Sequence, residues 1–334
     1  MVEDTRVAVL SADGMPEGLE RRVAELAERL GAGVALTVCT EDELRRELTR
    51  NDVLLLWDFF SRAVEPSWSE DATVRWIHVP AAGVDKMLFG GLIDADTVVT
   101  NARGIFDRPI SEYVLGMILR YYKQFGLTQD LARRREWRHR EPRTLEGSSV
   151  LVVGTGPIGR CTARLLRAVG MEVTGSGRRH LDSDPDFGPV LATEELPGRI
   201  GEFDVVVLVA PLTDTTRGMM SEELLGQMAQ GSYLINVGRG ELLDTSALEK
   251  VLRSGEGPLG GAGLDVFETE PLPPDSPLWT VPNLFISPHM SGDDLGWRDR
   301  LRDQFLANLE RWLSGQPLVN VVDKERGYVP VVTR

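Results

Sequence analysis

Three short segments in the second half of the chain carry side chains that could bind and protonate a small acid. Each places a polar side chain just past the carboxyl end of a predicted strand, and open α/β sheets bind ligands outside those ends. A planar guanidinium can grip a carboxylate with two parallel hydrogen bonds, and an imidazole can give or take a proton near neutral pH. The candidate side chains are Arg239 in Asn236–Gly240, Glu268 in Leu264–Leu272 and His289 in Ser287–Gly292.

The partner of His289 is expected to be a carboxylate that accepts a hydrogen bond from one ring nitrogen. Glu268 is our candidate, and Glu270, two residues further on, is the alternative. Such a contact fixes the tautomer and favours the charged ring. The chain holds four histidines, and only His289 follows a strand of the second series; a purely structural histidine is the competing interpretation.

A glycine-rich turn matches the pattern G-x-G-x-x-G, with Gly154, Gly156 and Gly159 as its glycines. An apolar run precedes the turn and a predicted helix follows it, which is the context that a dinucleotide site requires. Pro157 suits the first helical turn, and the helix N-terminus would face a pyrophosphate with free N–H groups. The alternative is a glycine turn that binds no ligand.

The residues about twenty positions after this turn bear on the choice of cofactor. An NAD site carries Asp or Glu there, whereas this chain has Gly177, Arg178 and Arg179. Arginine offers a charge-assisted fork to a 2′-phosphate, so NADP is our preferred prediction and NAD remains possible. In the alternative, both arginines face solvent and Asp182 or Asp184 folds back to the ribose.

Strands and helices alternate along most of the chain, which predicts parallel sheets covered by helices on both faces. The first series contains strands at 6–10, 34–39, 53–57, 74–79 and 97–100, with helices at 16–30 and 41–48. One long helix is expected from Ile110 to Arg138. The second series contains strands at 149–153, 172–175, 205–210, 233–237, 261–266 and 283–287, with helices at 159–169, after 221, at 244–254 and at 296–313.

Composition excludes several classes of protein. Lys and Arg number 37 against 51 Asp and Glu, and a net charge of −14 argues against nucleic-acid binding. Cys39 and Cys161 form no CxxC pair, so we expect neither a zinc site nor a disulfide framework. Apolar runs such as Val205–Pro211 are too short to cross a membrane, and no basic-then-apolar leader is present, so a cytoplasmic location is expected.

The chain resembles the D-isomer-specific 2-hydroxyacid dehydrogenases over nearly its whole length. The segments that carry the resemblance, besides those named above, are Ala82–Asp85, Asn101, Ser111–Tyr113, Pro211–Thr213 with Thr216, and Leu318–Val322. The end of the strand at Leu55–Trp57 and the two arginines are most like the NADPH-preferring glyoxylate/hydroxypyruvate reductases.

The resemblance implies a role for each candidate. Arg239 would bind the carboxylate of a 2-oxo acid, His289 would protonate the ketone oxygen, and Glu268, chosen by its spacing to Pro271, would orient His289. Ala82 and Gly83 would offer backbone amides to the substrate, with Trp57 nearby. Asp265 would meet the nicotinamide carboxamide, or else serve as a turn residue. The remaining expected cofactor contacts are Ile158, Ala210, Pro211, Thr216, Val237, Gly238 and Gly292.

The resemblance also implies two domains of the Rossmann-like or flavodoxin-like kind with a cleft between them. Residues 1–100 and 291–334 would form the substrate domain, and residues 101–290 the dinucleotide domain. Residues 110–138 look like the dimerisation arm of the family. The apolar side chains of this arm exceed one helix face, so a homodimer is expected, with Trp137 reaching toward the partner; these side chains are Tyr113, Met117, Leu119, Tyr121 and Phe125.

Two other functions are compatible with these motifs. One is a dehydrogenase for an unusual acid such as phosphite or a phosphonate. The other is a non-catalytic nucleotide sensor, like the corepressors that share this fold. Neither a partner-binding tail nor an added segment favours the sensor.

Overall fold

The computed structural model describes residues 4–330, which divide into two compact units. One unit contains the chain up to Ile105 together with the part from Leu295 onward, and the other runs from Phe106 to Asp294. These boundaries lie a few residues later than the expected ones. After the strand β5 (Val98–Asn101), the amide of Ala102 donates to the carbonyl of Ala81, which ties this segment to the first unit. The amide of Ser291 donates to Asp265, which ties the segment after residue 290 to the second.

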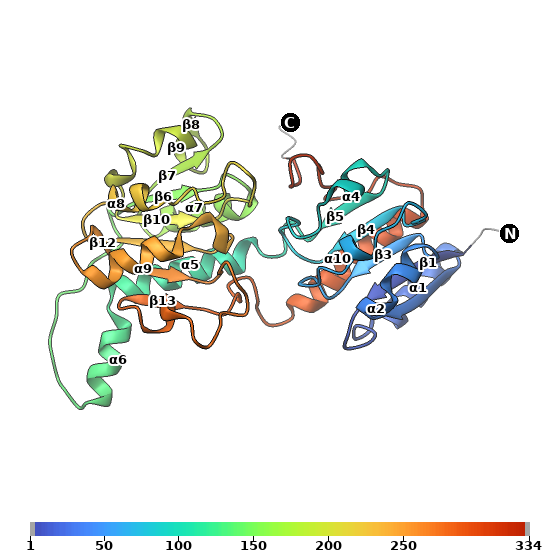
Figure 1. Cartoon of the computed structure of the whole chain (residues 1–334), viewed down its shortest axis with the longest axis horizontal. Coiled ribbons are helices and arrows are strands. Elements are labelled where there is room, and N and C mark those ends of the chain that lie inside the picture. Colours follow the sequence, from blue (N-terminus) through green and yellow to red (C-terminus); the bar gives the residue numbers. More distant parts are fainter. Residues whose placement is uncertain (1–3, 331–334) are drawn as a thin grey trace. The chain divides into compact units, whose positions relative to one another are not determined.

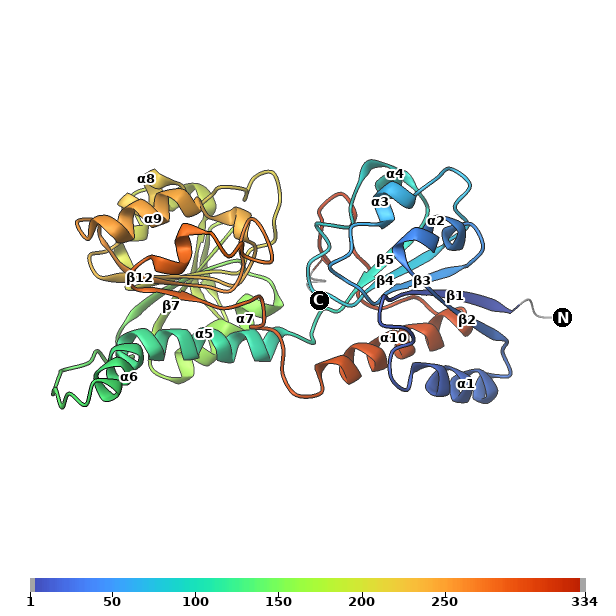
Figure 2. The same ribbon diagram turned by 60° about the horizontal axis from the view of Figure 1, so that its bottom comes forward.

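The first unit is built on a five-stranded parallel sheet in the order β2-β1-β3-β4-β5. Every residue of the central strands β3 (VLLL) and β4 (WIHV) is buried because both faces of the sheet are covered by helices. In Figure 2, α1 and α10 lie on one face and α2, α3 and α4 on the other. The bounds are β1 Thr5–Leu10, β2 Val34–Cys39, β3 Val53–Leu56, β4 Trp76–Val79, β5 Val98–Asn101, α1 Leu19–Leu30, α2 Glu41–Leu48, α3 Val64–Ser67, α4 Gly90–Asp94 and α10 Trp297–Leu313.

Alternate residues of these strands pack into two separate cores. On one face, Leu54 and Leu56 pack with Leu44 and Leu48 of α2. On the opposite face, Val53 and Leu55 pack with α1 and with Phe305 and Leu309 of α10. Helix α10 therefore belongs to this unit although it lies near the end of the chain.

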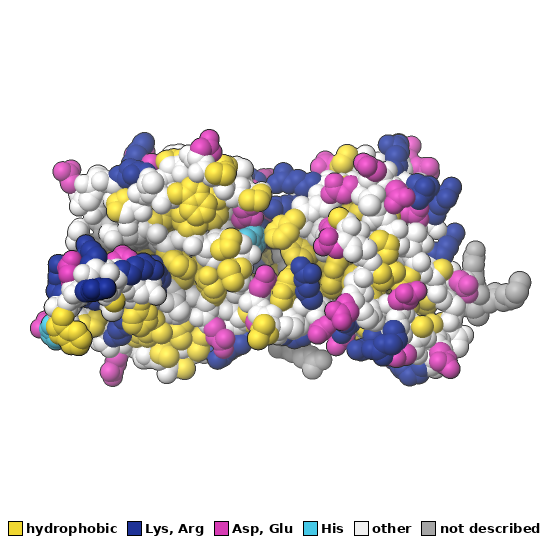
Figure 3. Space-filling model, turned by 90° about the horizontal axis from the view of Figure 1, so that it is seen from below, with side chains coloured by type: hydrophobic (Ala, Val, Ile, Leu, Met, Phe, Trp, Pro, Cys, Tyr) yellow, Lys and Arg dark blue, Asp and Glu magenta, His cyan; other side chains and the backbone are white. Residues whose placement is uncertain are grey.

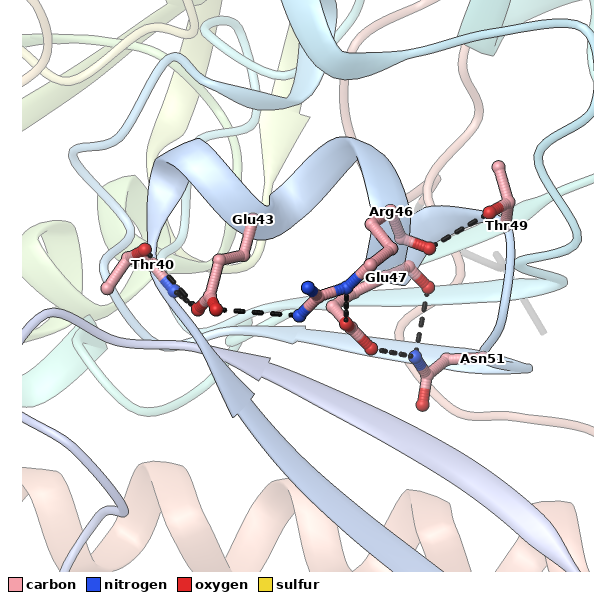
Figure 4. A network of polar contacts seen from close by, with 6 residues as sticks. All are labelled: Thr40, Glu43, Arg46, Glu47, Thr49 and Asn51. Carbon is pink, nitrogen blue, oxygen red and sulfur yellow. Dashed lines mark hydrogen bonds and ion pairs between the residues drawn. The ribbon is translucent and has the colours of Figure 1, made fainter.

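Helix α2 is closed at both ends by side chains (Figure 4). At its start, the amide of Thr40 donates to Glu43 Oε2 at 3.2 Å, which forms a capping box. Near its end, the buried carboxylate of Glu47 accepts from Arg46 Nε at 2.7 Å and from Asn51 Nδ2 at 3.0 Å. The negative charge of Glu47 is thereby satisfied, which is the condition for burying it.

The second unit contains an eight-stranded sheet in the order β13-β12-β11-β10-β6-β7-β9-β8 (Figure 1). Seven strands are parallel, as predicted, and the edge strand β8 runs antiparallel to β9, so this sheet is mixed. Strand β8 has the sequence LDSD, and this polar edge strand gives no apolar pattern to detect. The bounds are β6 Ser149–Val153, β7 Glu172–Gly177, β8 Leu181–Asp184, β9 Gly188–Ala192, β10 Val205–Leu208, β11 Ser232–Asn236, β12 Leu259–Leu264 and β13 Leu284–Ile286.

Helices cover both faces of this sheet as well. In Figure 2, α5 and α7 lie on one face, and α8 and α9 lie on the other. Chain order reverses between β6 and its neighbour β10, which is the point where open α/β sheets bind ligands. The bounds are α5 Asp107–Tyr122, α6 Phe125–Arg133, α7 Pro157–Ala168, α8 Glu222–Gly226 and α9 Thr245–Ser254.

The single helix expected from Ile110 to Arg138 is instead two helices. Gln124 adopts the left-handed conformation, with φ of 53°, and separates α5 from α6. Its side chain accepts a hydrogen bond from Arg140 Nε at 2.9 Å, a contact from a loop sixteen residues away. Helical periodicity carries no sign of such a distant contact, so the sequence could not predict the break.

Most of the apolar side chains expected at a dimer interface are used within this unit. Met117 is buried, Tyr121 stacks on Tyr233 with 4.2 Å between ring centroids, and Tyr113 hydrogen-bonds to Ser287. Met117 is therefore committed to the core of this unit, whereas Tyr113 and Tyr121 are only partly buried, and the homodimer stays a prediction. Phe125, at the start of α6, is exposed.

Candidate active site

Three neighbouring strands of the second unit position the candidate side chains. Arg239 follows β11, His289 follows β13, and the segment 268–270 follows β12, which lies between them. The two loops after β11 and β12 touch at Gly240, where a Cβ atom would lie 1.9 Å from the carbonyl carbon of Phe267. Only glycine permits this approach, so the GRG sequence is a packing requirement as well as a chemical one.

Asn236 holds the loop that carries Arg239. Its buried side-chain amide donates to the Arg239 carbonyl at 2.8 Å and accepts from the Gly238 amide at 3.1 Å. The guanidinium of Arg239 is partly exposed, and its Nη1 donates to the Gly238 carbonyl at 2.8 Å. Both contacts restrict where the positive charge can lie.

The carboxylate beside His289 belongs to Glu270, and the choice of Glu268 for this contact was wrong. His289 Nδ1 lies 2.8 Å from Glu270 Oε2, whereas Glu268 is exposed and accepts from Thr245 Oγ1 at 3.2 Å. The reason is a turn in which the Phe267 amide donates to Glu270 Oε1 at 2.9 Å. Glutamates two residues apart look equivalent in the sequence. The turn that selects Glu270 is visible only in the structure.

The backbone at His289 is left-handed, with φ of 51°, and is held by Asp265. The His289 amide donates to the Asp265 carbonyl at 2.8 Å. The fully buried carboxylate of Asp265 accepts from Ser287 Oγ at 2.6 Å and from the amides of Met290 and Ser291 at 3.0 and 2.9 Å. These contacts match the turn-residue interpretation of Asp265, and its contact with a nicotinamide stays a prediction.

The glycine-rich turn between β6 and α7 is shaped as a dinucleotide cradle. A Cβ at Gly154 would lie 2.7 Å from the backbone of Val209 and Ala210, and one at Gly159 would lie 1.9 Å from the Gly154 carbonyl oxygen. A Cβ at Gly156, by contrast, would meet nothing within 4 Å. Gly156 and Pro157 begin α7 without a side-chain cap, which leaves backbone amides to face an anion. The residues of this turn therefore fit a bound pyrophosphate.

The loop after β7 leaves Arg178 and Arg179 exposed. The alternative in which Asp184 folds back to the ribose was wrong, because Arg160 Nη1 and Nη2 each donate to that carboxylate at 2.9 Å. Asp182 lies beside His180 in solvent. Hydrogen bonds with Glu195 and then Asp182 raise the pKa of His180.

The other expected cofactor residues lie at the same carboxyl edge or on α7. Thr216 Oγ1 donates to the Pro211 carbonyl at 2.7 Å and accepts from the Thr213 amide at 2.8 Å, so it shapes the turn after β10. Ala210 directly precedes this turn. Val237 and Gly238 follow β11, Ile158 lies on α7, and Gly292 packs against Phe106.

Trp57, Ala82 and Gly83 belong to the first unit. Trp57 directly follows β3, and Ala82 and Gly83 follow β4, so all three lie at the carboxyl edge of that sheet. The Ala82 carbonyl accepts from Asn101 Nδ2 at 2.6 Å, which holds the loop. Contact of these residues with a substrate stays a prediction.

Among the other histidines within residues 4–330, His180 also pairs with carboxylates, Glu195 and Asp182, but it lies in the exposed loop of Arg178 and Arg179. His78 is fully buried, which lowers its pKa to about 3, and its Nδ1 lies 2.8 Å from Thr100 Oγ1. His139 and His180 lie in exposed loops. In the same described range, no helix is long and apolar enough to cross a membrane, and no group of three or more His, Cys, Asp or Glu side chains could hold a metal ion.

Comparison with known proteins agrees with this geometry. Residues 115–291 match the family model described as "D-isomer specific 2-hydroxyacid dehydrogenase, NAD binding domain". Glyoxylate/hydroxypyruvate reductase A of Serratia proteamaculans is 32% identical over 285 residues, which cover 83% of this chain and 88% of that protein.

Solved structures are similar over almost the whole chain. One is the NADPH-dependent glyoxylate/hydroxypyruvate reductase of Sinorhizobium meliloti in complex with NADP and sulfate. The two chains superpose with a TM-score of 0.78 and 28% sequence identity, over 97% of this chain and 100% of the reductase. A D-isomer specific 2-hydroxyacid dehydrogenase of Xanthobacter autotrophicus, in complex with NADPH and MES, has a TM-score of 0.77 and 28% identity, with coverage of 98% and 100%. The chain belongs to the D-isomer specific 2-hydroxyacid dehydrogenase family and is an NAD(P)-dependent oxidoreductase that transfers hydride between its cofactor and a 2-hydroxy or 2-oxo acid.

Proposed function

We propose that this protein is an NADPH-preferring reductase of small 2-oxo acids of the glyoxylate and hydroxypyruvate kind, and that it works in the cytoplasm. The observation that carries the proposal is the contact between Glu270 and His289. These residues follow β12 and β13, and Arg239 follows β11, the strand next to β12. An acid, its orienting carboxylate and a carboxylate-binding cation are what reduction of a 2-oxo acid requires. Relatives named as glyoxylate/hydroxypyruvate reductases support the substrate class.

In this proposal, Arg239 binds the carboxylate of the substrate and polarises its ketone oxygen. When bound, the reduced nicotinamide supplies the hydride. Glu270 can only accept a hydrogen bond, so His289 Nδ1–H donates to it and Nε2 carries the proton that moves. That proton goes from Nε2 to the former ketone oxygen of the substrate, and the hydroxy acid results. The Phe267 amide, 2.9 Å from Glu270 Oε1, keeps the carboxylate in place as the ring changes charge.

The cofactor preference rests on the loop after β7. Arg178 and Arg179 are exposed there, and the nearby Asp184 is engaged by Arg160. A 2′-phosphate would gain charge-assisted hydrogen bonds with the arginines, whereas NADH offers only hydroxyls there. The structures of relatives with bound NADP or NADPH support the same choice.

We also propose that the protein acts as a homodimer through α6 and the loop after it. Phe125 and Leu127 on α6 are 52% and 40% exposed, and Trp137 is fully exposed. The face seen in Figure 3 carries several hydrophobic patches, with a cluster of Lys and Arg beside those at the left. Large apolar side chains exposed in this way favour burial against a second copy of the chain. Sedimentation at micromolar concentration should give a dimer, and a monomer would contradict this proposal.

The experiment that tests the proposed function is a turnover assay on a panel of 2-oxo acids with both cofactors. Glyoxylate and hydroxypyruvate should be reduced, with a higher kcat/KM for NADPH than for NADH. The same assay separates a reductase from a nucleotide sensor, which would bind the cofactor without turnover. A lack of turnover on every 2-oxo acid would reject the proposal.

A further inference from the structure

A tyrosine on α5 is connected to the loop of His289 through two buried polar groups. The hydroxyl oxygen of Tyr113 lies 2.7 Å from Ser287 Oγ, and Ser287 Oγ lies 2.6 Å from Asp265 Oδ1. Ser287 and Asp265 are buried, and Tyr113 is partly buried. The three residues come from α5, from the end of β13 and from the end of β12.

The direction of each hydrogen bond follows from what the groups can do. An ionised carboxylate only accepts, so Ser287 gives its single hydroxyl proton to Asp265. Ser287 Oγ can then only accept from Tyr113, so the tyrosine is the donor. Tyr113 thus keeps the hydroxyl of Ser287 turned toward Asp265.

Asp265 transmits this constraint to the proton donor. Its carboxylate also accepts from the amides of Met290 and Ser291, and its carbonyl accepts from the amide of His289. His289 lies between these anchored positions with φ of 51°, a conformation that non-glycine residues adopt at a cost and that surrounding contacts must maintain. The place of the imidazole against Glu270 therefore depends on how firmly Asp265 is held.

We propose that Tyr113 is a positioning residue for the reaction, which acts through Ser287 and Asp265 on the proton donor His289. This inference rests on the proposed function, because it takes His289 as the donor. Tyr113 itself touches neither the imidazole nor Glu270 in the contacts that define this chain of hydrogen bonds. Its effect should therefore fall on turnover and leave binding unchanged.

The test compares Tyr113→Phe with Tyr121→Phe, a matched control on the same helix. Tyr121 also uses its hydroxyl in one hydrogen bond, to the carbonyl of Gly231 at 3.2 Å, which is unrelated to the His289 loop. In Tyr113→Phe, kcat should fall roughly 3- to 10-fold, the range for losing one neutral hydrogen bond that orients the donor. The KM of the 2-oxo acid and the Kd of NADPH should stay at the parent values, and Tyr121→Phe should keep the parent kcat.

Three further variants test whether the effect passes through Ser287. Ser287→Ala should lower kcat at least as much as Tyr113→Phe, and Ser287→Thr, which keeps the hydroxyl, should restore most of it. The double variant Tyr113→Phe/Ser287→Ala should be no slower than Ser287→Ala alone, because both changes break the same chain.

Some results would overturn the proposal. An equal kcat in Tyr113→Phe and Tyr121→Phe, additive losses in the double variant, or a loss confined to the Kd of NADPH would each do so. The variant His289→Gln shows whether the positioning role of Tyr113 or the proposed function itself is wrong. If His289→Gln is nearly inactive while Tyr113→Phe is normal, only the positioning role is wrong; if His289→Gln is fully active, the donor itself is wrong.

Discussion

Nδ1 of His289 lies 2.8 Å from Oε2 of Glu270, and Glu268, two residues earlier, turns away to the hydroxyl of Thr245. The structure therefore offers a pair of glutamates in one loop, of which one is placed to act on the histidine. Glu270→Gln should lower kcat by roughly 10- to 100-fold, as for other carboxylates that orient a functional imidazole. Glu268→Gln is the matched control and should keep the parent kcat. Steady-state kinetics on glyoxylate would decide, and a larger loss in Glu268→Gln would reverse the assignment.

Arg239→Lys should impair use of the substrate although it keeps the positive charge. Lysine cannot form the bidentate grip, and its ammonium lacks the contact that Arg239 Nη1 makes with the Gly238 carbonyl. Loss of a charged hydrogen bond is worth about 1.5–3 kcal/mol, which should appear in kcat/KM for the 2-oxo acid. The Kd of NADPH serves as the internal control and should not change. Parent efficiency in the lysine variant would exclude the bidentate grip.

The sequence predicted much of the fold because apolar runs mark buried strands. The strands at 34–39 and 149–153 and the helix at 41–48 have the bounds that the sequence indicated. Strand β8 is polar and lies at an edge, and the left-handed Gln124 separates α5 from α6 without interrupting the apolar pattern, so neither left a local signal.

The sequence also predicted part of the candidate site. Arg239 and His289 follow strands as expected because each loop contains one obvious functional side chain. The choice between Glu268 and Glu270 depended on a turn closed by the Phe267 amide, which residue spacing does not reveal. The link from Tyr113 to Ser287 joins residues 174 positions apart, so only the fold could show it.

Cofactor preference should depend on the two exposed arginines. Replacing Gly177 with Asp and Arg178 with Ala should shift the ratio of kcat/KM values from NADPH toward NADH, since it adds repulsion of the 2′-phosphate and removes attraction. Arg164→Ala is a control, because that arginine pairs with Asp186 on the β8–β9 side and should not alter the ratio. In the parent, the preference for NADPH should weaken as salt screens the arginines. An unmodified protein that prefers NADH would contradict the arginine argument.

Acid should destabilise the protein through His78, which is buried beside Thr100. Burial lowers the pKa of His78 to about 3 in the folded state, from 6.5 when unfolded. The unfolded chain therefore binds one more proton between these values, so the free energy of unfolding should fall by up to ~1.4 kcal/mol per pH unit as the pH drops below the unfolded value. Asp184 and Asp204 have lowered pKa values in the folded state. Their contribution to the free energy of unfolding is therefore lost only when the pH falls below the ordinary pKa of 3.8, at more acidic pH than the effect of His78.

Denaturant unfolding at pH 7, 6 and 5 would measure this slope. His139→Gln, which changes an exposed histidine, is the control and should leave the slope as it is. A free energy of unfolding that stays constant over this range would show that His78 is not held neutral by burial.

The central claim is that His289 gives the proton in reduction of a 2-oxo acid, and His289→Gln tests it most directly. Glutamine retains a polar side chain at the position but cannot donate as an imidazolium does. The kcat for glyoxylate with NADPH should fall by roughly 10²- to 10⁴-fold, the usual contribution of a positioned acid, while the Kd of NADPH stays at the parent value. A variant that binds NADPH normally and turns over at close to the parent rate would contradict the account.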